Sequence, residues 1–208
     1  MGLDYSYRLY FHRQNLWSAL QGIADISAHT TLPTLVVFPD HVRAYPMEGW
    51  GEKKKIIPWD DPEFGFVVSI YFDKDEEIVE YLRRLHGAKF DEVALDNPAG
   101  LAIGSIYINV YNDLNRFEEK TWDTDIVLID LGTPGKHMSM LFFESSSIRH
   151  RFQQLLERCQ GICGVLNMED YGYVIWHKGK RMDRRIPDPY MSPDEIEAYL
   201  AEHNEDDQ

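Results

Sequence analysis

Three times along the chain, a triplet of apolar and aromatic residues is followed by one polar residue and then by apolar positions at helical spacing. The triplets are Leu9–Phe11, Ile70–Phe72 and Leu141–Phe143. Polar and apolar residues alternate before the first triplet, and a period of two is typical of a strand with one buried face. Each triplet is therefore predicted to end a strand that leads into an amphipathic helix.

The segments that follow each predicted helix have the pattern of paired strands. Paired strands are expected at 35–38 and 42–45, at 102–111 (a long strand) and 121–131, and at 162–168 and 173–177. The element order β-α-β-β would then occur in about three units, at 1–47, 66–131 and 137–186. The proline- and glycine-containing segment 46–65 is predicted to be a loop.

Helix boundaries are marked by residues that commonly cap helices. Asp73 with Glu76 resembles a capping box for the second helix, and Ser145, Ser146 or Ser147 is expected to cap the third. Ser192, followed by Pro193, predicts a helix start, so residues 191–208 should form a C-terminal helix and an acidic tail.

These elements predict an α+β fold in which repeated units form a mostly antiparallel sheet with helices packed on one side. Residues 1–190 would make one compact domain. The element order resembles that of the duplicated ligand-binding domains attached to some bacterial transcription regulators, although no sequence motif of a family accompanies it.

Composition places the chain among folded proteins of the cytoplasm. Of its 208 residues, 44% are hydrophobic and 27% are charged, which is ordinary for a globular protein. No apolar run is long enough to span a bilayer, and the first residues lack the pattern of a signal peptide. Two cysteines are too few for a disulfide framework. A cytoplasmic protein without a membrane partner is expected.

The net charge of −14 argues against nucleic acid as a partner, because an acidic surface repels phosphates. The charge is uneven: residues 144–186 carry a net +3, residues 187–208 carry −8, and residues 1–143 carry −9. The basic run 178–185 could contact an acidic group, or it could be neutralised by the acidic residues that follow it.

Sequence motifs with a known chemistry are sparse. Cys159 and Cys163 lack histidines at ligand spacing and are expected to be buried, reduced thiols. Asp123 and Asp125, with Asp130 further on, could hold a hard cation, but carboxylates on exposed strand faces are common. We therefore predict no metal site, no cofactor and no catalytic residue.

One candidate for anion binding lies at the predicted start of the third helix, where Ser145, Ser146, Ser147 and Arg149 come together. Free backbone N–H groups, hydroxyls and a guanidinium suit an anion at that position. The alternative is an ordinary helix cap, with the arginines paired to acids on a neighbouring element.

Three functions remain open from the sequence. The first is a non-catalytic, bacterial-type binding protein whose acidic surface takes a basic protein, as an inhibitor or immunity protein would, with Trp50 and Trp59 as anchors. The second is a binder of a cationic or other small molecule in an aromatic-lined cleft. The third is an enzyme that uses the neighbourhood of His137, Arg149 and His150. Trp50 and Trp59 could equally cover a sheet edge.

Overall fold

The computed structural model describes residues 4–31, 33–50, 55–87, 90, 97–116 and 121–203. Five α-helices and thirteen strands are assigned within these ranges. The helices are α1 Leu16–Asp25, α2 Glu76–His86, α3 Lys136–Glu144, α4 Ser146–Arg158 and α5 Pro193–Glu202. The strands are β1 Ser6–His12, β2 Thr34–Val37, β3 Val42–Tyr45, β4 Glu48–Trp50, β5 Ile56–Pro58, β6 Glu63–Val68, β7 Tyr71–Phe72, β8 Leu101–Ala102, β9 Ile106–Tyr111, β10 Ile126–Gly132, β11 Cys163–Asn167, β12 Gly172–His177 and β13 Lys180–Ile186.

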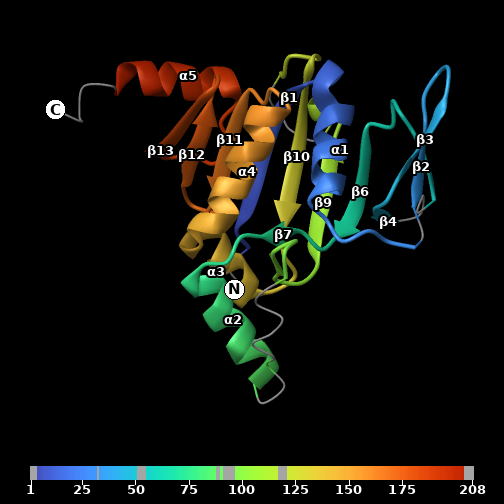
Figure 1. Cartoon of the computed structure of the whole chain (residues 1–208). Helices are drawn as coiled ribbons and strands as arrows, with labels where there is room; N and C mark the ends of the chain where they lie inside the picture. Colours follow the sequence, from blue (N-terminus) through green and yellow to red (C-terminus); the bar gives the residue numbers. More distant parts are fainter. Residues whose placement is uncertain are drawn as a thin grey trace.

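An eight-stranded sheet in the order β13-β12-β11-β1-β10-β9-β6-β4 forms the body of the molecule (Figure 1). Every neighbouring pair in it is antiparallel. The first strand of the sequence lies near the centre, between β10 and β11, so the sheet joins segments far apart along the chain. A three-stranded sheet, β3-β2-β5, and the short pair β7-β8 complete the β-structure.

Central strand β1 is buried on both faces rather than on one. Tyr7, Leu9 and Phe11 belong to the main core, whereas Tyr10 belongs to a second core on the opposite face, and all four have no exposed surface. The alternation of polar and apolar residues correctly predicted the strand, but it wrongly predicted that one face would be exposed. Arg8 and Tyr10, at the intervening positions, are also buried.

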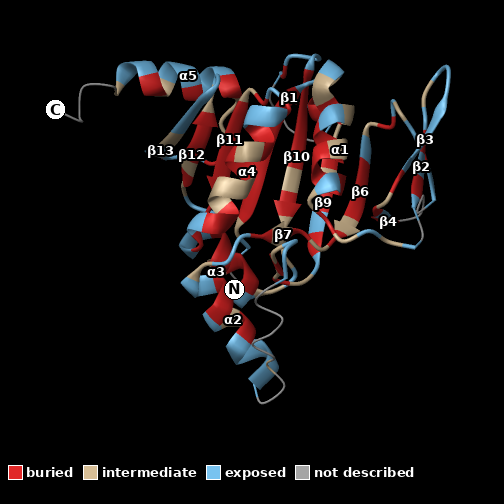
Figure 2. Ribbon diagram, viewed as in Figure 1, coloured by how far each residue is buried: buried red, intermediate tan, exposed pale blue. Residues whose placement is uncertain are grey.

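Helices lie on both faces of the large sheet and at one end of it. α1 and α4 pack side by side over one face, and α3 and α2 lie beyond one end of the strands (Figure 2). α5 packs on the other face, where Ile196 and Leu200 join Tyr10, Val165 and Val174. α5 is the predicted C-terminal helix and lies on the face opposite to α1 and α4, and its capping box at Ser192 and Glu195 is confirmed.

The third apolar triplet is helical, which corrects the predicted strand at the start of unit 137–186. Residues 141–143 lie in α3, whose buried Met138, Leu141 and Phe142 follow helical spacing. A short run of apolar residues is compatible with a strand or a buried helix turn, so periodicity alone does not distinguish them. The first two triplets do end strands, in β1 and β7.

The structure supports an α+β fold but does not show three repeated units. β2 and β3 of the first unit lie in the small sheet, whereas the strands after α2 and α4 lie mainly in the large one. Segment 46–65, predicted to be a loop, contains β4, β5 and the start of β6. These strands are short and depend on tertiary pairing for their conformation. The acidic tail 204–208 lies outside the described residues.

Candidate functional site

The described residues cover the second face of the large sheet only in part. α5 packs over the half formed by β1 and β11–β13, where it closes the second core. On the other half, the outward side chains of β4, β6 and β9 include Trp50, Glu63 and Tyr107, all of them exposed. An open sheet surface with aromatic side chains therefore lies next to a closed one.

Strand register places five residues in one row across this open face. Trp50 is opposite Gly65, Gly65 is opposite Asn109, Asn109 is opposite Asp130, and Asp130 is opposite Arg8. Residues directly opposite in antiparallel strands project on the same side of a sheet. The row thus runs from an exposed indole to a partly buried aspartate and a buried arginine.

The row of residues ends at a pocket of about 320 Å³, the sheet-face pocket. A separate pocket of about 390 Å³ lies between α2 and α3. The sheet-face pocket is lined by groups of three kinds: charged, phenolic and aliphatic. Its lining residues are Arg8, Glu63, Tyr111, Leu114, Leu128, Asp130 and Tyr190.

Arg8 and Asp130 put opposite charges at the base of the sheet-face pocket. Arg8 is 3% exposed, and its guanidinium donates a 3.2 Å hydrogen bond to the carbonyl of Pro189. Burial raises the pKa of the Asp130 carboxyl above its ordinary value, while the Arg8 charge and a hydrogen bond from the Ser6 hydroxyl partly offset this rise. Oδ1 of Asp130 is buried and accepts no hydrogen bond within the described chain. Such an acceptor favours a ligand that brings an N–H donor.

Tyr190 forms one wall of the sheet-face pocket and is 48% exposed. Its ring lies 4.6 Å from Cζ of Arg8, a cation–π distance, and its hydroxyl lies 3.3 Å from Nδ2 of Asn167. The residue belongs to the segment between β13 and α5, so the C-terminal part of the chain completes a pocket whose base comes from β1 and β10.

Trp50, predicted as a partner-binding anchor, is held flat above Gly65 at the edge of the open face. Its Nε1 donates to the carbonyl of Ile108 at 3.2 Å, and its ring meets Tyr107 edge to face with centroids 6.4 Å apart. A Cβ at position 65 would lie only 2.0 Å from Nε1 of Trp50. Glycine at 65 is thus required by the close approach of the indole.

Trp59, the second predicted anchor, lies in a different environment. Its side chain is partly buried against the main core, and its backbone N–H donates to the carbonyl of Val37. The structure therefore does not bring Trp50 and Trp59 together on one exposed surface. Arg8, Glu63 and Tyr190 carry no local sequence signal of a site, because their convergence depends on strand order.

The predicted anion site at the start of α4 already holds a carboxylate of the same chain. Oδ2 of Asp75 accepts from the hydroxyl of Ser145 at 2.5 Å and from the backbone N–H of Ser147 at 3.0 Å. Oδ1 of Asp75 accepts from the N–H of Ile78 and so caps α2 as well. Asp75, rather than the predicted Asp73, is the N-cap of α2. The chemistry expected of an anion site is present, and an internal anion uses it.

The remaining groups near this helix start are paired along the protein surface. Arg149 forms a 2.8 Å ion pair with Asp183, and Arg151 forms one with Asp73. Ser146 is exposed and lines a shallow depression together with Arg149 and His150. In the basic run 178–185, Lys178 pairs with Glu197 of α5 and Arg181 pairs with Glu157 of α4. Part of the run is thus neutralised by acids both after and before it.

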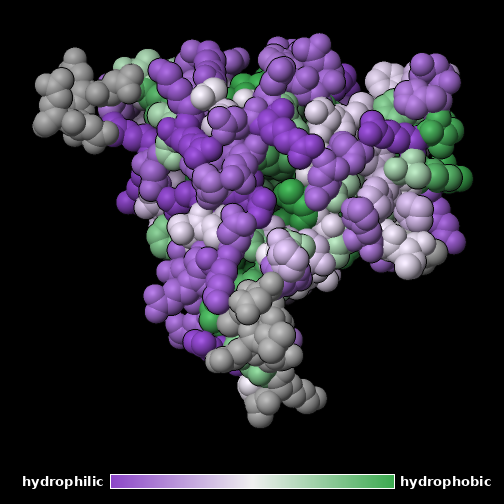
Figure 3. Space-filling model, in the orientation of Figure 1, coloured by the Kyte–Doolittle hydropathy of each residue, from purple (hydrophilic) through white to green (hydrophobic). Residues whose placement is uncertain are grey.

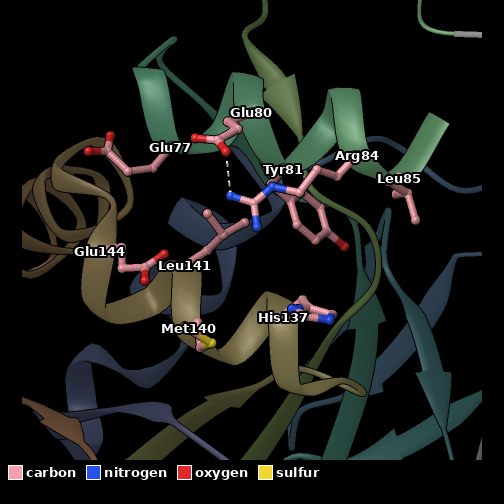
Figure 4. Close-up of a pocket in the computed structure, with 9 residues that line it drawn as sticks. All are labelled: Glu77, Glu80, Tyr81, Arg84, Leu85, His137, Met140, Leu141 and Glu144. Carbon is pink, nitrogen blue, oxygen red and sulfur yellow. Dashed lines mark hydrogen bonds and ion pairs between the residues drawn. The ribbon is translucent and has the colours of Figure 1, made fainter. Parts of the chain in front are cut away.

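His137, proposed with Arg149 and His150 as an enzyme site, lies apart from them. It lines the 390 Å³ groove between α2 and α3, whereas Arg149 and His150 line the depression beside α4. Figure 4 shows Glu77, Glu80 and Glu144 around one end of the α2–α3 groove, with His137 and Tyr81 toward the other. Arg84 is engaged in an ion pair with Glu80 across one helical turn.

Both cysteines are buried and unpaired thiols. Burial raises the pKa of the Cys163 thiol to about 12 and also raises that of Cys159. Asp125 pairs with His12 and lies apart from Asp130 in the sheet. No group of three metal-ligating side chains that could hold an ion occurs in the part of the chain that the structure describes.

Comparisons of this chain with protein-family models, with curated proteins and with solved structures found no match. No helix among the described residues is both long and apolar enough to cross a membrane.

Replacing Asp75 with alanine should lower the free energy of unfolding by about 2 kcal/mol, since α2 loses its cap and α4 loses the acceptor at its N-terminus. Urea unfolding followed by circular dichroism measures this change. Asp73→Ala is the matched control, because it removes an exposed ion pair worth at most about 1 kcal/mol. If Asp75→Ala lowered the free energy of unfolding no more than the control does, the role of Asp75 in capping both helices would be contradicted.

Native protein should react with a thiol reagent at pH 8 far more slowly than unfolded protein. In the folded protein the pKa of the Cys163 thiol is about 12, whereas that of an unfolded cysteine is about 8.5. At pH 8 the folded thiol is therefore almost entirely protonated and unreactive. The same difference predicts a stability contribution that is complete below about pH 8.5 and is lost as pH rises toward 12. Timed labelling with and without urea tests the first point, and rapid labelling of both thiols in folded protein would refute it.

Proposed function

We propose that this chain is a non-catalytic binding protein whose open sheet face takes a basic protein partner. In the proposed complex, a lysine or arginine side chain of the partner enters the sheet-face pocket, and neighbouring partner residues lie over Trp50 and Tyr107. The observation that carries the proposal is the buried Oδ1 of Asp130, an acceptor without a donor within the described chain at the base of this pocket.

Charge and shape around the sheet-face pocket both suit a cation. Glu63 and Asp130 contribute two carboxyls to the lining against the single guanidinium of Arg8. Arg8 is itself held by the Pro189 carbonyl and the Tyr190 ring, so it is already engaged within the protein. The phenol rings of Tyr111 and Tyr190 supply the aromatic walls that stabilise ammonium or guanidinium groups.

Exposed aromatic residues beside the sheet-face pocket suit a protein surface. Trp50 is 43% exposed and Tyr107 is 38% exposed, and both lie on the same face as Glu63. Aromatic anchors next to a pocket are common energetic centres of protein interfaces. The net charge of −14 would speed the approach of a basic partner, as expected for an inhibitor or immunity-type protein.

A small cationic molecule is the second candidate ligand. The pocket volume of about 320 Å³ is large enough for a small organic ligand, and the two tyrosines in its lining support this candidate. Such a ligand would use Asp130 and Glu63 without needing Trp50. The contribution of Trp50 to affinity therefore separates the two candidates.

Asp130→Asn should weaken binding of a short arginine-rich peptide roughly tenfold or more, because the mutation removes the negative charge facing the ligand. Isothermal titration calorimetry measures the affinity for the peptide. A second titration with agmatine measures the affinity for a small cation. Glu63→Gln tests the same pocket at its exposed rim, where folding is not at risk. Glu77→Gln in the α2–α3 groove is the matched control and should leave affinity unchanged. If Glu77→Gln abolished binding while Asp130→Asn and Glu63→Gln left it unchanged, the binding site would instead be the α2–α3 groove.

Affinity for the peptide should also fall as salt rises, since the Debye length shrinks from about 10 Å at 0.1 M to about 3 Å at 1 M. Because its pKa is raised, Asp130 takes up a proton at a higher pH than an ordinary carboxyl does, so on acidification binding should weaken at a higher pH than an ordinary carboxyl would predict. Affinity that is indifferent to both salt and pH would contradict the charged pocket.

Gly65→Ala should displace the Trp50 indole, because the added Cβ would lie 2.0 Å from Nε1. We expect a shifted tryptophan emission spectrum and weaker peptide binding, with agmatine binding unaffected. Gly132→Ala is the control on the same face, where an added Cβ meets nothing within 4 Å. Peptide binding that survives Gly65→Ala unchanged, despite a shifted spectrum, would favour the small-molecule candidate.

A further inference from the structure

The three-stranded sheet β3-β2-β5 carries an apolar outer face. Register places Leu35 beside Ala44 and Ile56, and Val37 beside Val42 and Pro58. All six are exposed, with Val42 and Ile56 at 58% and 57%. Figure 3 shows hydrophobic residues gathered at this end of the molecule, where Figure 1 labels β2 and β3. These six residues form the outer face of the small sheet.

The opposite side of this small sheet packs normally. Thr34, Val36, Tyr45 and Ile57 point inward and are almost completely buried. A sheet with one solvated side usually alternates apolar and polar residues along each strand, whereas a run such as Leu35-Val36-Val37 is typical of a strand covered on both sides. The sequence of β2 is therefore typical of a strand with a second covering layer, which the described residues of one copy do not supply.

We propose that the outer face binds the same face of a second copy, which makes the protein a two-fold symmetric homodimer. None of the six outward positions carries a charge, so two outer faces can pack without burying one. In a two-fold interface the same patch serves both subunits, which requires a self-complementary surface. Elsewhere, a chain with net charge −14 repels its own copies, so an uncharged face is the surface on which they can meet.

Charges at the two ends of the small sheet select one orientation of the dimer. β2 and β5 are parallel, so Asp40 after β2 and Asp60 after β5 lie at the same end. Lys55 precedes β5 at the other end, and all three are exposed. A two-fold axis perpendicular to the strands would stack the acidic end of each sheet on the lysine end of the other. An axis parallel to the strands would stack like charges on one another.

The dimer should be weak and should dissociate on dilution. Six side chains cover less area than the roughly 800 Å² per partner of a typical stable interface. The association would leave the open face of the large sheet unoccupied, so it does not depend on the binding function proposed above.

Sedimentation velocity over a hundredfold range of protein concentration tests the proposal. Wild-type protein should shift from monomer to dimer, and Ile56→Lys or Val42→Lys should stay monomeric throughout. Leu85→Lys is the matched control, because Leu85 is 58% exposed on α2, far from the outer face in the sequence and in the fold. The control should dimerise like wild type.

Charge reversal tests the orientation. Lys55→Glu should weaken the dimer, and adding Asp40→Lys and Asp60→Lys to it should restore association. A wild-type protein that is monomeric at every concentration would overturn the proposal, as would a dimer that persists in Ile56→Lys. Monomers that sediment with phosphatidylcholine–phosphatidylserine vesicles, and lose this in Ile56→Lys, would instead assign the outer face to a lipid surface.

Discussion

The pairing of β1 with β10 on one side and β11 on the other holds the molecule together. β1 pairs from Ser6 to His12 with β10 and from Ser6 to Tyr10 with β11, so the first strand of the chain connects the half that ends at β4 to the half that ends at β13. Its side chains enter both cores. A strand buried on both faces cannot shift register by one residue without exchanging its two sets of side chains, which fixes the position of every strand around it.

Fixing the register of β1 also fixes the candidate binding site. Arg8 lies opposite Asp130 only because β1 and β10 pair as they do, and Tyr190 reaches Arg8 only because α5 and the segment before it cover the second face. Burying Arg8 and Asp130 is costly, since each charge loses its hydration. That cost is partly offset by the Pro189 carbonyl, the Tyr190 ring and the Ser6 hydroxyl. The Oδ1 of Asp130 is the part of this arrangement that a ligand could complete.

Asp75 gives a second example of one side chain serving two elements. It caps α2 and closes the N-terminus of α4, so the helix pair at the end of the sheet is joined through one carboxylate. At the start of α4, the hydroxyl of Ser145 and the backbone N–H of Ser147 donate to the carboxylate of Asp75, an anion of the same chain. The identity of that anion follows from the path of the chain between β7 and α2, which brings Asp75 next to Ser145.

The sequence by itself determined the α+β class, most strands, four of the five helices and the caps at Ser145 and Ser192, because these depend on local periodicity and capping chemistry. It did not determine that residues 141–143 are helical, that Trp59 packs against the core while Trp50 lies exposed, or that β2 and β3 leave the large sheet. Those outcomes depend on which segments pair at long range. Tertiary structure alone decided the sheet-face pocket and the outer face, since each is assembled from strands whose order is not encoded in local pattern.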